Sequence, residues 1–157
     1  AAVNGFALAG GWSIAQMCDL RIASEEAKLG ISETRWSLLP PFGAILPKQM
    51  NLASVLELVL TAQPVTAQRA YDMGFLNKVV PAADLMEESM AMAQQIADNA
   101  PLAVQTFKEL ACRGLNMSNQ DISALTDQMY DALLQTEDSM EGPRAFAEKR
   151  KPQWKGR

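Results

Sequence analysis

A glycine-rich stretch near the start of the chain could bind an anion through its backbone. Residues 4–13 read NGFALAGGWS and lead into a predicted helix at 14–18. The first N–H groups of a helix lack partners and carry its positive dipole end, and glycine lets a ligand oxygen come close. The stretch could therefore hold an oxyanion. Tight helix packing explains the same pattern, and the spacing fits neither GxGxxG nor a phosphate-binding loop.

A single carboxylate in an apolar part of the sequence is the second candidate. Glu33 follows a predicted strand at 28–30 and precedes an apolar segment at 36–42. Apolar surroundings favour the neutral form of a carboxyl group, which suits it to move protons near neutral pH. Taken alone, these residues fit better with an exposed Glu33 that pairs with Arg35 or Lys48.

The residue types limit the chemistry further. None of the 157 residues is histidine, which excludes Ser-His-Asp and Cys-His sites and histidine metal ligands. Acid–base chemistry must then rest on carboxylates, Lys, Tyr or Cys. Cys18 and Cys112 form no CxxC pair and no disulfide framework, so a reducing, cytoplasmic location is predicted. We predict no metal and no bound cofactor.

Composition and charge indicate a globular domain rather than a nucleic-acid or membrane protein. Hydrophobic residues make up 48% and charged residues 20% of the chain. The net charge of −4 disfavours nucleic-acid binding, although residues 144–157 form a basic end with six Lys and Arg against one Glu. No apolar run approaches the roughly 18 residues that a membrane-spanning helix needs. Because the chain begins directly with a strand-like segment, we expect an N-terminal portion to be missing.

Short strands and tight turns are predicted first, and helices follow. Strands are predicted at 1–3, 20–23, 28–30 and 78–80. Helices are predicted at 53–61 and 66–73, after Pro81 with a methionine-rich face, from Pro101 to a stop at Gly114, and after a Ser118 cap. The sequence therefore predicts a mixed α/β part at 1–80 and a helical part at 81–157, joined as one continuous unit.

Several segments together resemble the crotonase superfamily, the enoyl-CoA hydratases and isomerases. The similar segments are AVNGFALAGG at 2–11, CDLRIA at 18–23, LGISE at 29–33, LT at 60–61, Ala70, GFLNKVV at 74–80 and EGPRAFAEKR at 141–150. The resemblance implies an α/β fold: a crotonase-like spiral of ββα turns, of which this chain is the second half only, followed by a helical C-terminal trimerisation region. The family's first half would bring one oxyanion-hole amide and much of the CoA pocket.

The resemblance also implies roles for individual residues. It places the oxyanion-hole amide at Gly10, where the thioester carbonyl gains enolate charge, and one of two catalytic glutamates at Glu33. It places CoA contacts at Phe146 and Lys149, in some members from a neighbouring subunit. The remaining residues that we assign to substrate binding are Ala9, Gly11, Ser13, Trp36, Pro41 and Phe42. Cations that oppose a helix dipole are the simpler explanation of the basic end.

Two departures from the family pattern fall on the groups that position water. The second catalytic glutamate of the family falls on Ser13, and serine cannot act as a carboxylate base. Hydratases usually have Pro-Gly where this chain has Pro40 and Pro41, and proline has no N–H to hold the attacking water. A site with one glutamate resembles that of Δ3,Δ2-enoyl-CoA isomerases.

We therefore expect an acyl-CoA enzyme, with an enoyl-CoA isomerase favoured over the alternative, a hydratase. The substrate would be a coenzyme A thioester, and the protein would be a homotrimer or a dimer of trimers. A non-catalytic subunit that binds acyl-CoA or only oligomerises is the other class of protein that fits the sequence. The presence of Glu33 argues against it, because a pure binder has no need for a buried carboxylate.

Overall fold

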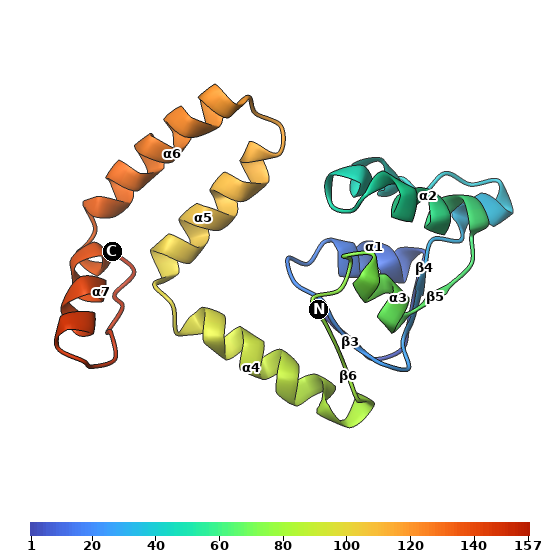
Figure 1. Cartoon of the computed structure of the whole chain (residues 1–157), viewed down its shortest axis with the longest axis horizontal. Coiled ribbons are helices and arrows are strands. Elements are labelled where there is room, and N and C mark those ends of the chain that lie inside the picture. The colour runs from blue at the N-terminus through green and yellow to red at the C-terminus, as the bar shows by residue number, and fades with distance from the viewer. The chain divides into compact units, whose positions relative to one another are not determined.

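Two small sheets form the first part of the chain (Figure 1). The structure is a computed structural model that describes residues 1–157. The first sheet has the order β1-β3-β6 and the second β2-β4-β5. The strands are β1 (Ala2–Val3), β2 (Phe6–Leu8), β3 (Ile22–Ser24), β4 (Lys28–Gly30), β5 (Val65–Thr66) and β6 (Lys78–Val80).

The first four strands alternate between the two sheets, which winds this part of the chain into a spiral. β1 and β2 are followed by α1 (Gly10–Gln16), and β3 and β4 by the 3₁₀ turns η1 (Glu33–Trp36) and η2 (Gly43–Lys48) and by α2 (Leu52–Thr61). β3 pairs in parallel with β1, and β4 pairs in parallel with β2. Each strand pair with its helix is thus a ββα turn stacked on the previous one. β6 joins β3 in parallel, and β5 pairs with β4 antiparallel.

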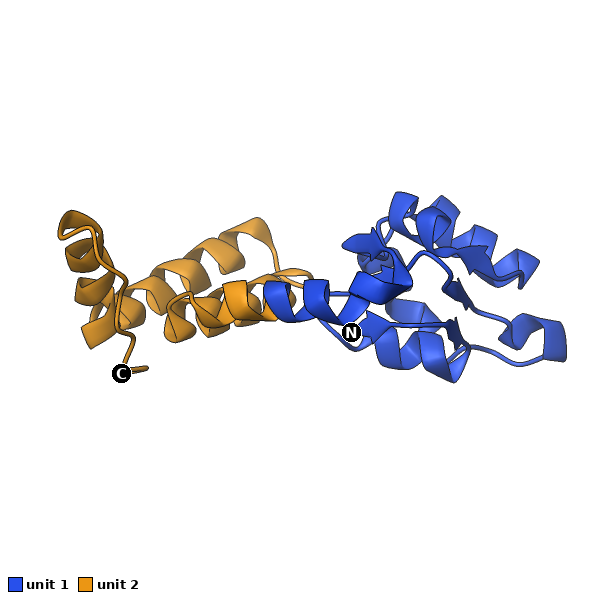
Figure 2. Cartoon of the chain, turned by 90° about the horizontal axis from the view of Figure 1, so that it is seen from below, with its two compact units in different colours: residues 1–92 blue, residues 93–157 orange.

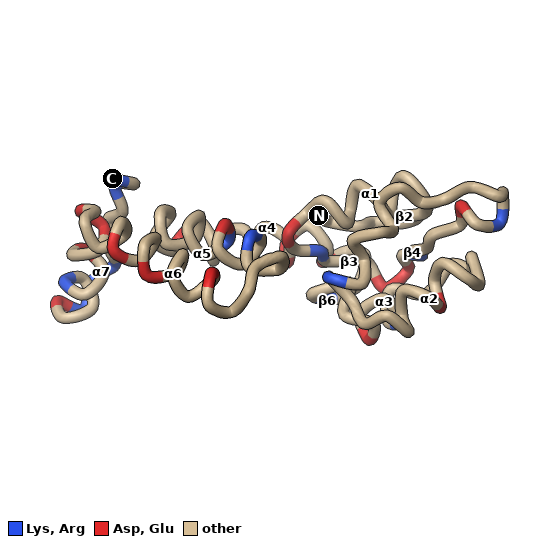
Figure 3. The backbone as a smooth tube through the Cα atoms, turned by 90° about the horizontal axis from the view of Figure 1, so that it is seen from above, with Lys and Arg blue, Asp and Glu red and all other residues tan.

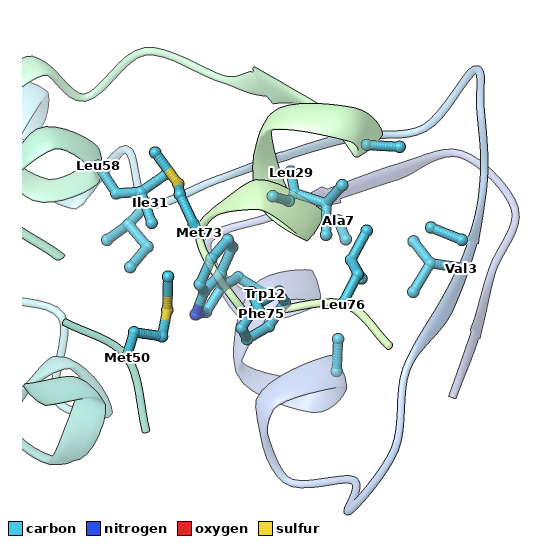
Figure 4. Packing of buried hydrophobic residues seen from close by; sticks show 14 of the residues in the cluster. Val3, Ala7, Trp12, Leu29, Ile31, Met50, Leu58, Met73, Phe75 and Leu76 are labelled. Atoms are coloured by element: carbon cyan, nitrogen blue, oxygen red, sulfur yellow. The ribbon is translucent and has the colours of Figure 1, made fainter. Parts of the chain in front are cut away.

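Aromatic stacking fills the centre of this part of the chain. Trp12 of α1 is fully buried and stacks on Phe75, with ring centroids 3.8 Å apart and planes 15° from parallel (Figure 4). Leu29, Ile31 and Leu58 are also fully buried in the same cluster. Burial of such large side chains contributes about 1.5–3 kcal/mol each, so this cluster holds α1 against the sheets.

An arginine fixes the far end of α1. The Arg21 side chain donates hydrogen bonds to the carbonyl oxygens of Ala15, Cys18 and Phe75, and its guanidinium lies 4.6 Å from the Phe75 ring centroid. The last carbonyls of a helix lack partners within the helix and carry its negative dipole end. Arg21 therefore satisfies the C-terminal end of α1 and ties it to the aromatic cluster.

Helices make up the rest of the chain. They are α3 (Ala67–Asp72), the 3₁₀ turn η3 (Ala82–Asp84), α4 (Leu85–Ala97), α5 (Pro101–Gly114), α6 (Asn119–Leu134) and α7 (Glu137–Ala147). The chain divides into two compact units, residues 1–92 and 93–157, coloured separately in Figure 2. The oligomerisation role assigned to residues 81–157 stays a prediction.

Most predicted elements are confirmed, with differences at the shortest ones. The strands at 28–30 and 78–80 and the helix from Pro101 to Gly114 have the predicted bounds. The helix predicted at 14–18 is wrong in its bounds, because α1 already begins at Gly10. The strands β2 and β5 were not predicted, since two or three residues carry too little pattern to reveal pairing with distant strands.

Candidate functional site

The two candidate groups for chemistry lie at the same edge of the second sheet. β2 and β4 run in parallel with Leu8 opposite Gly30, so their carboxyl ends meet at one edge. Gly10 follows β2 after one residue, and Glu33 follows β4 after two. Strand pairing thus places a helix start and a carboxylate at one edge, although the two residues are far apart in the sequence.

An unusual backbone conformation at Ala9 starts α1 at this edge. Ala9 has φ 48° and ψ −113°, a region that residues with a side chain rarely occupy. Its N–H donates to the carbonyl of Gly30 at 3.0 Å, and its own carbonyl accepts from the N–H of Ser13. Since that is the first hydrogen bond of the helix, the N–H groups of Gly10 and Gly11 have no helical partner.

The space beside Gly10 is open. A Cβ built at Gly10 would meet no other atom within 4 Å, and the residue is exposed. By contrast, a Cβ at Gly30 would lie 3.1 Å from the Cα of Pro64. Gly10 therefore has an N–H without a helical partner at a helix start and open space where a side chain would stand, and its assignment as the oxyanion-hole amide stays a prediction.

Glu33 places a carboxylate oxygen without a hydrogen-bond partner in the segment that follows β4, at the same edge of the sheet as the start of α1. It is the first residue of η1 and is half-buried, and its Oε2 is buried without any hydrogen-bond partner. The guanidinium of Arg35 donates instead to the carbonyl of Ala62 at 3.1 Å. Buried polar atoms without partners are rare in folded proteins, so this oxygen marks Glu33 as a candidate group for chemistry, and its role as the proton acceptor stays a prediction.

The segment after Glu33 differs from the expectation that it would surround the carboxylate. Trp36 is 70% exposed and Leu39 is 85% exposed. The chain turns outward after η1, where Ser37 takes the left-handed conformation with φ 59°. Residues 36–39 of the apolar segment therefore lie at the surface of this unit, and the assignment of Trp36 to substrate binding stays a prediction.

A buried glutamine that the sequence analysis did not single out holds the next loop. Gln16, the last residue of α1, accepts from the indole N–H of Trp12 and donates to the carbonyl of Phe42, both at 3.2 Å. Phe42 is half-buried against the core cluster, whereas Pro41 is exposed. The only sequence signal was an amide residue four positions after a tryptophan in the same short helix.

Ser13 and Pro41, the two departures from the family pattern, both lie near α1. Ser13 is half-buried on the first turn of α1, one turn after Ala9. Pro41 lies in the loop that Gln16 holds. Both residues are therefore on segments attached to α1, and their assigned roles in substrate binding stay predictions.

The second unit presents Phe146 and Lys149 at its surface. Phe146 is 88% exposed near the end of α7. Lys149 follows the helix in the left-handed conformation with φ 53°, and the N–H of Arg150 closes the turn on the carbonyl of Ala145. This is the position that glycine usually occupies after a helix. The predicted CoA contacts of both residues stay predictions.

Acidic residues of α7 neutralise most of the basic C-terminus. Arg144 and Arg150 pair with Glu148, Arg150 also pairs with Glu141, and Lys155 and Arg157 pair with Glu137. Figure 3 shows the acidic and basic positions interspersed along this end of the chain. The predicted basic patch is therefore wrong as a continuous surface. Lys149 and Lys151 are the two cations of this segment without an acidic partner.

The last residues of the chain return along α7 and are held by its carboxylates. The buried Asp138 accepts from the N–H groups of Lys155 at 2.7 Å and Gly156 at 2.9 Å. Glu141 accepts from the N–H of Gln153 at 2.7 Å. Hydrogen bonds from Lys155 and the charge of Arg157 lower the pKa of Glu137. The tail thus stabilises the charged form of Glu137.

Acid should release this tail from α7. The side chain of Arg150 and the amide of Gln153 lower the pKa of Glu141 to about 2, from an ordinary value of 4.5. A carboxyl group whose pKa is lowered by folding stabilises the fold above its ordinary pKa, and this contribution is lost as the pH falls toward the folded value. We expect the NMR signal of the Trp154 indole N–H, which donates to the backbone carbonyl of Asp98, to shift between pH 4.5 and 2.

The variant Arg150→Met provides the matched test of this acid transition. Without the guanidinium, the pKa of Glu141 should rise toward its ordinary value, and the transition should move to higher pH. An unchanged midpoint would contradict the role of the Glu141–Arg150 pair.

No group of three or more Cys, Asp and Glu side chains is placed to hold a metal ion. None of the helices is both long and apolar enough to cross a membrane.

Comparison with known proteins identifies the family. A family model described as enoyl-CoA hydratase/isomerase matches residues 1–157. The carnitinyl-CoA dehydratase of Proteus mirabilis (strain HI4320) is 39% identical, over 100% of this chain and 62% of that protein. The carnitinyl-CoA dehydratase of Salmonella typhi is 37% identical with the same coverage.

Solved structures agree with this family at the level of the fold. The enoyl-CoA hydratase of Bacillus anthracis aligns with a TM-score of 0.95 at 37% identity, over 99% of this chain and 61% of that one. The enoyl-CoA hydratase of Mycobacterium tuberculosis H37Rv aligns with a TM-score of 0.95 at 32% identity, over 99% and 63%.

The chain therefore belongs to the enoyl-CoA hydratase/isomerase family, the crotonase superfamily, and its α/β fold is confirmed. It spans about 62% of the length of the curated relatives that it matches. That it forms the second half of the fold stays a prediction.

Proposed function

We propose that the whole protein to which this chain belongs acts on acyl-CoA thioesters through an enolate intermediate. The observation that carries this proposal is the buried, unpartnered Oε2 of Glu33 at the same sheet edge as the free amide of Gly10. Membership of the enoyl-CoA hydratase/isomerase family supports the substrate class.

The Gly10 amide would stabilise charge on the substrate. When a proton leaves the carbon next to the thioester carbonyl, the carbonyl oxygen gains negative charge. The N–H of Gly10 would donate to that oxygen at the positive end of α1, with a second donor needed from outside this chain. Ala9 and Gly11 on either side shape the approach of the oxygen. No bound cofactor is required by this chemistry, and coenzyme A enters only as part of the substrate.

Glu33 would move the proton. Its carboxylate takes the proton from the carbon alpha to the carbonyl, which leaves the electron pair in the enolate. In an isomerisation the same carboxyl group returns the proton to the gamma carbon, and the double bond moves from the 3 to the 2 position. Atoms balance because the proton that leaves the substrate returns to it.

We propose isomerisation of 3-enoyl-CoA as the preferred reaction. Ser13 and Pro41 support this preference, because they replace a carboxylate and an amide that would position water. Hydration of 2-enoyl-CoA, or its reverse, is the second candidate. The names of the similar proteins, carnitinyl-CoA dehydratase and enoyl-CoA hydratase, support that candidate.

The whole protein should isomerise 3-enoyl-CoA more efficiently than it hydrates 2-enoyl-CoA. Both values of kcat/KM are to be measured on one preparation over several acyl lengths. Replacement Ser13→Glu should raise hydration about 10²-fold or more, because a second acid–base group is typically worth 10² to 10⁴ in rate. Ser13→Gln is the control of similar size that adds no carboxylate. Hydration well above isomerisation in the unaltered protein would refute the isomerase preference.

We also propose that the protein forms a homotrimer or a dimer of trimers in a reducing compartment such as the cytoplasm. Large apolar side chains exposed in the second unit support the assembly, namely Phe107, Leu115, Tyr130, Met140 and Phe146. The two free cysteines, Cys18 and Cys112, support the reducing compartment.

A further inference from the structure

Gln16 is a buried polar side chain beside the aromatic stack of the first unit. It is 4% exposed, and its neighbour Trp12 is fully buried. Trp12 cannot shift easily, because its ring is stacked on Phe75. An uncompensated amide in such a place is costly, so the hydrogen bonds of Gln16 determine whether this part of the core is stable.

The two partners of Gln16 fix the orientation of its amide. The indole N–H of Trp12 can only donate, so it faces Oε1 at 3.2 Å. The carbonyl of Phe42 can only accept, so it faces Nε2 at 3.2 Å. A side chain at this position must therefore accept at one end and donate at the other. Methionine does neither with comparable strength, and glutamate does both only while it is protonated.

The hydrogen bond to Phe42 joins two segments of the proposed site. α1 begins with Gly10 and ends with Gln16, and the loop 40–43 follows η1, which begins with Glu33. The loop is closed on itself by the N–H of Gly43, which donates to the carbonyl of Pro40 at 2.9 Å. Because the loop is a small closed turn, one bond to its centre fixes the position of the whole turn, including Pro41.

We propose that Gln16 is a positioning residue that holds the loop 40–43 against α1 and so sets the distance from Pro41 and Phe42 to the Gly10 end of that helix. The inference rests on the proposed function, since the loop matters for catalysis only if a thioester binds at Gly10. Gln16 itself touches neither substrate nor reacting atoms. It acts through the carbonyl of Phe42.

The test compares Gln16→Met with Gln16→Glu in the whole protein. In Gln16→Met we expect amide hydrogen exchange at Phe42 and Gly43, the two residues of the loop 40–43 that carry an N–H, to be at least tenfold faster, with the rest of the unit unchanged. For the enoyl-CoA reaction we expect kcat to fall about 10- to 100-fold, because a displacement of about 1 Å can cost 10² in rate. KM should stay within threefold. Gln68→Met, on the exposed surface of α3, is the matched control and should change neither the hydrogen exchange of the loop nor kcat and KM.

Gln16→Glu separates positioning from a general loss of packing. Burial raises the pKa of an introduced carboxyl group, so at pH 5 it should be protonated, accept from Trp12 and donate to Phe42. At pH 8 it is charged and repels the carbonyl. Arg21, which binds carbonyls at the same end of α1, stays charged at both pH values. Relative to the unaltered protein at each pH, loop exchange should be near normal at pH 5 and at least tenfold faster at pH 8.

Loop exchange within twofold of normal in Gln16→Met would overturn the proposal. Faster exchange across the whole first unit in that variant, or no recovery of Gln16→Glu at pH 5, would also overturn it, because Gln16 would then only fill space. The exchange measurement needs no substrate. Absence of turnover in the unaltered protein would therefore refute the proposed function, and the exchange data would still decide whether Gln16 holds the loop.

Discussion

Replacement of Glu33 by glutamine should lower kcat for enoyl-CoA isomerisation by about 10² to 10⁴, the usual contribution of a general acid–base group. The amide keeps the size of the side chain but cannot take a proton from carbon. Since Oε2 has no hydrogen-bond partner in the fold, the substitution breaks no internal bond at that atom. We therefore expect the melting temperature and the Kd of a saturated acyl-CoA to stay within experimental scatter of the unaltered protein.

Glu26→Gln is the matched control for this experiment. Glu26 is exposed in the turn between β3 and β4, within the same compact unit. It should leave kcat, binding and stability unchanged. If Glu33→Gln kept turnover within a few-fold of normal, Glu33 would be a structural residue, and the proposed proton transfer would have to be assigned elsewhere.

Elements with a strong local pattern were predictable from the sequence. The spacing of Met86, Met90 and Ala93 predicted the helix that the structure shows as α4. Ser118 caps α6 by accepting from the N–H of Asp121 at 3.1 Å, as predicted for a cap at this position. Such signals depend on residues within one helical turn of each other, so the sequence contains all the information needed.

Elements that depend on distant pairing were not predictable in the same way. β2 has three residues, and only its pairing with β4 defines it as a strand. The start of α1 at Gly10 depends on the rare conformation of Ala9, which the hydrogen bond to Gly30 helps to hold. Alanine gives no sign in a sequence that its φ is positive, because glycine, asparagine and aspartate are the usual residues there.

The candidate site shows the same division. The physics of helix starts indicated free amides in the stretch 4–13 without fixing the helix start, and the resemblance singled out Gly10 and Glu33. Neither revealed why the two come to one sheet edge, which follows from the parallel pairing of β2 and β4. The role of Gln16 needed three-dimensional information as well, because its partner Phe42 is 26 residues away. The alternative that Glu33 pairs with Arg35 was reasonable from sequence and is disfavoured by the bond from Arg35 to Ala62.

Replacement of Gly10 by alanine should remove activity and leave the fold intact. A Cβ at Gly10 meets nothing within 4 Å, so the protein has room for the methyl group. The substitution removes no contact of the fold, so the melting temperature should hold. The methyl group would crowd the open space through which a carbonyl oxygen reaches the amide. We expect kcat/KM to fall about 10²- to 10³-fold, as when one oxyanion donor is lost.

Two other glycines make this experiment discriminating. Gly5→Ala adds the same methyl group in equally open space, in the turn between β1 and β2, and should retain both activity and stability. Gly30→Ala should lower the melting temperature, because its Cβ would lie 3.1 Å from the Cα of Pro64, a backbone atom that cannot move alone. If Gly10→Ala kept full activity, no substrate oxygen could approach this amide closely, and the oxyanion role would belong to another part of the protein. If the melting temperature of Gly10→Ala fell as far as that of Gly30→Ala, unfolding would explain its loss of activity, and the open space at Gly10 would have no connection to catalysis.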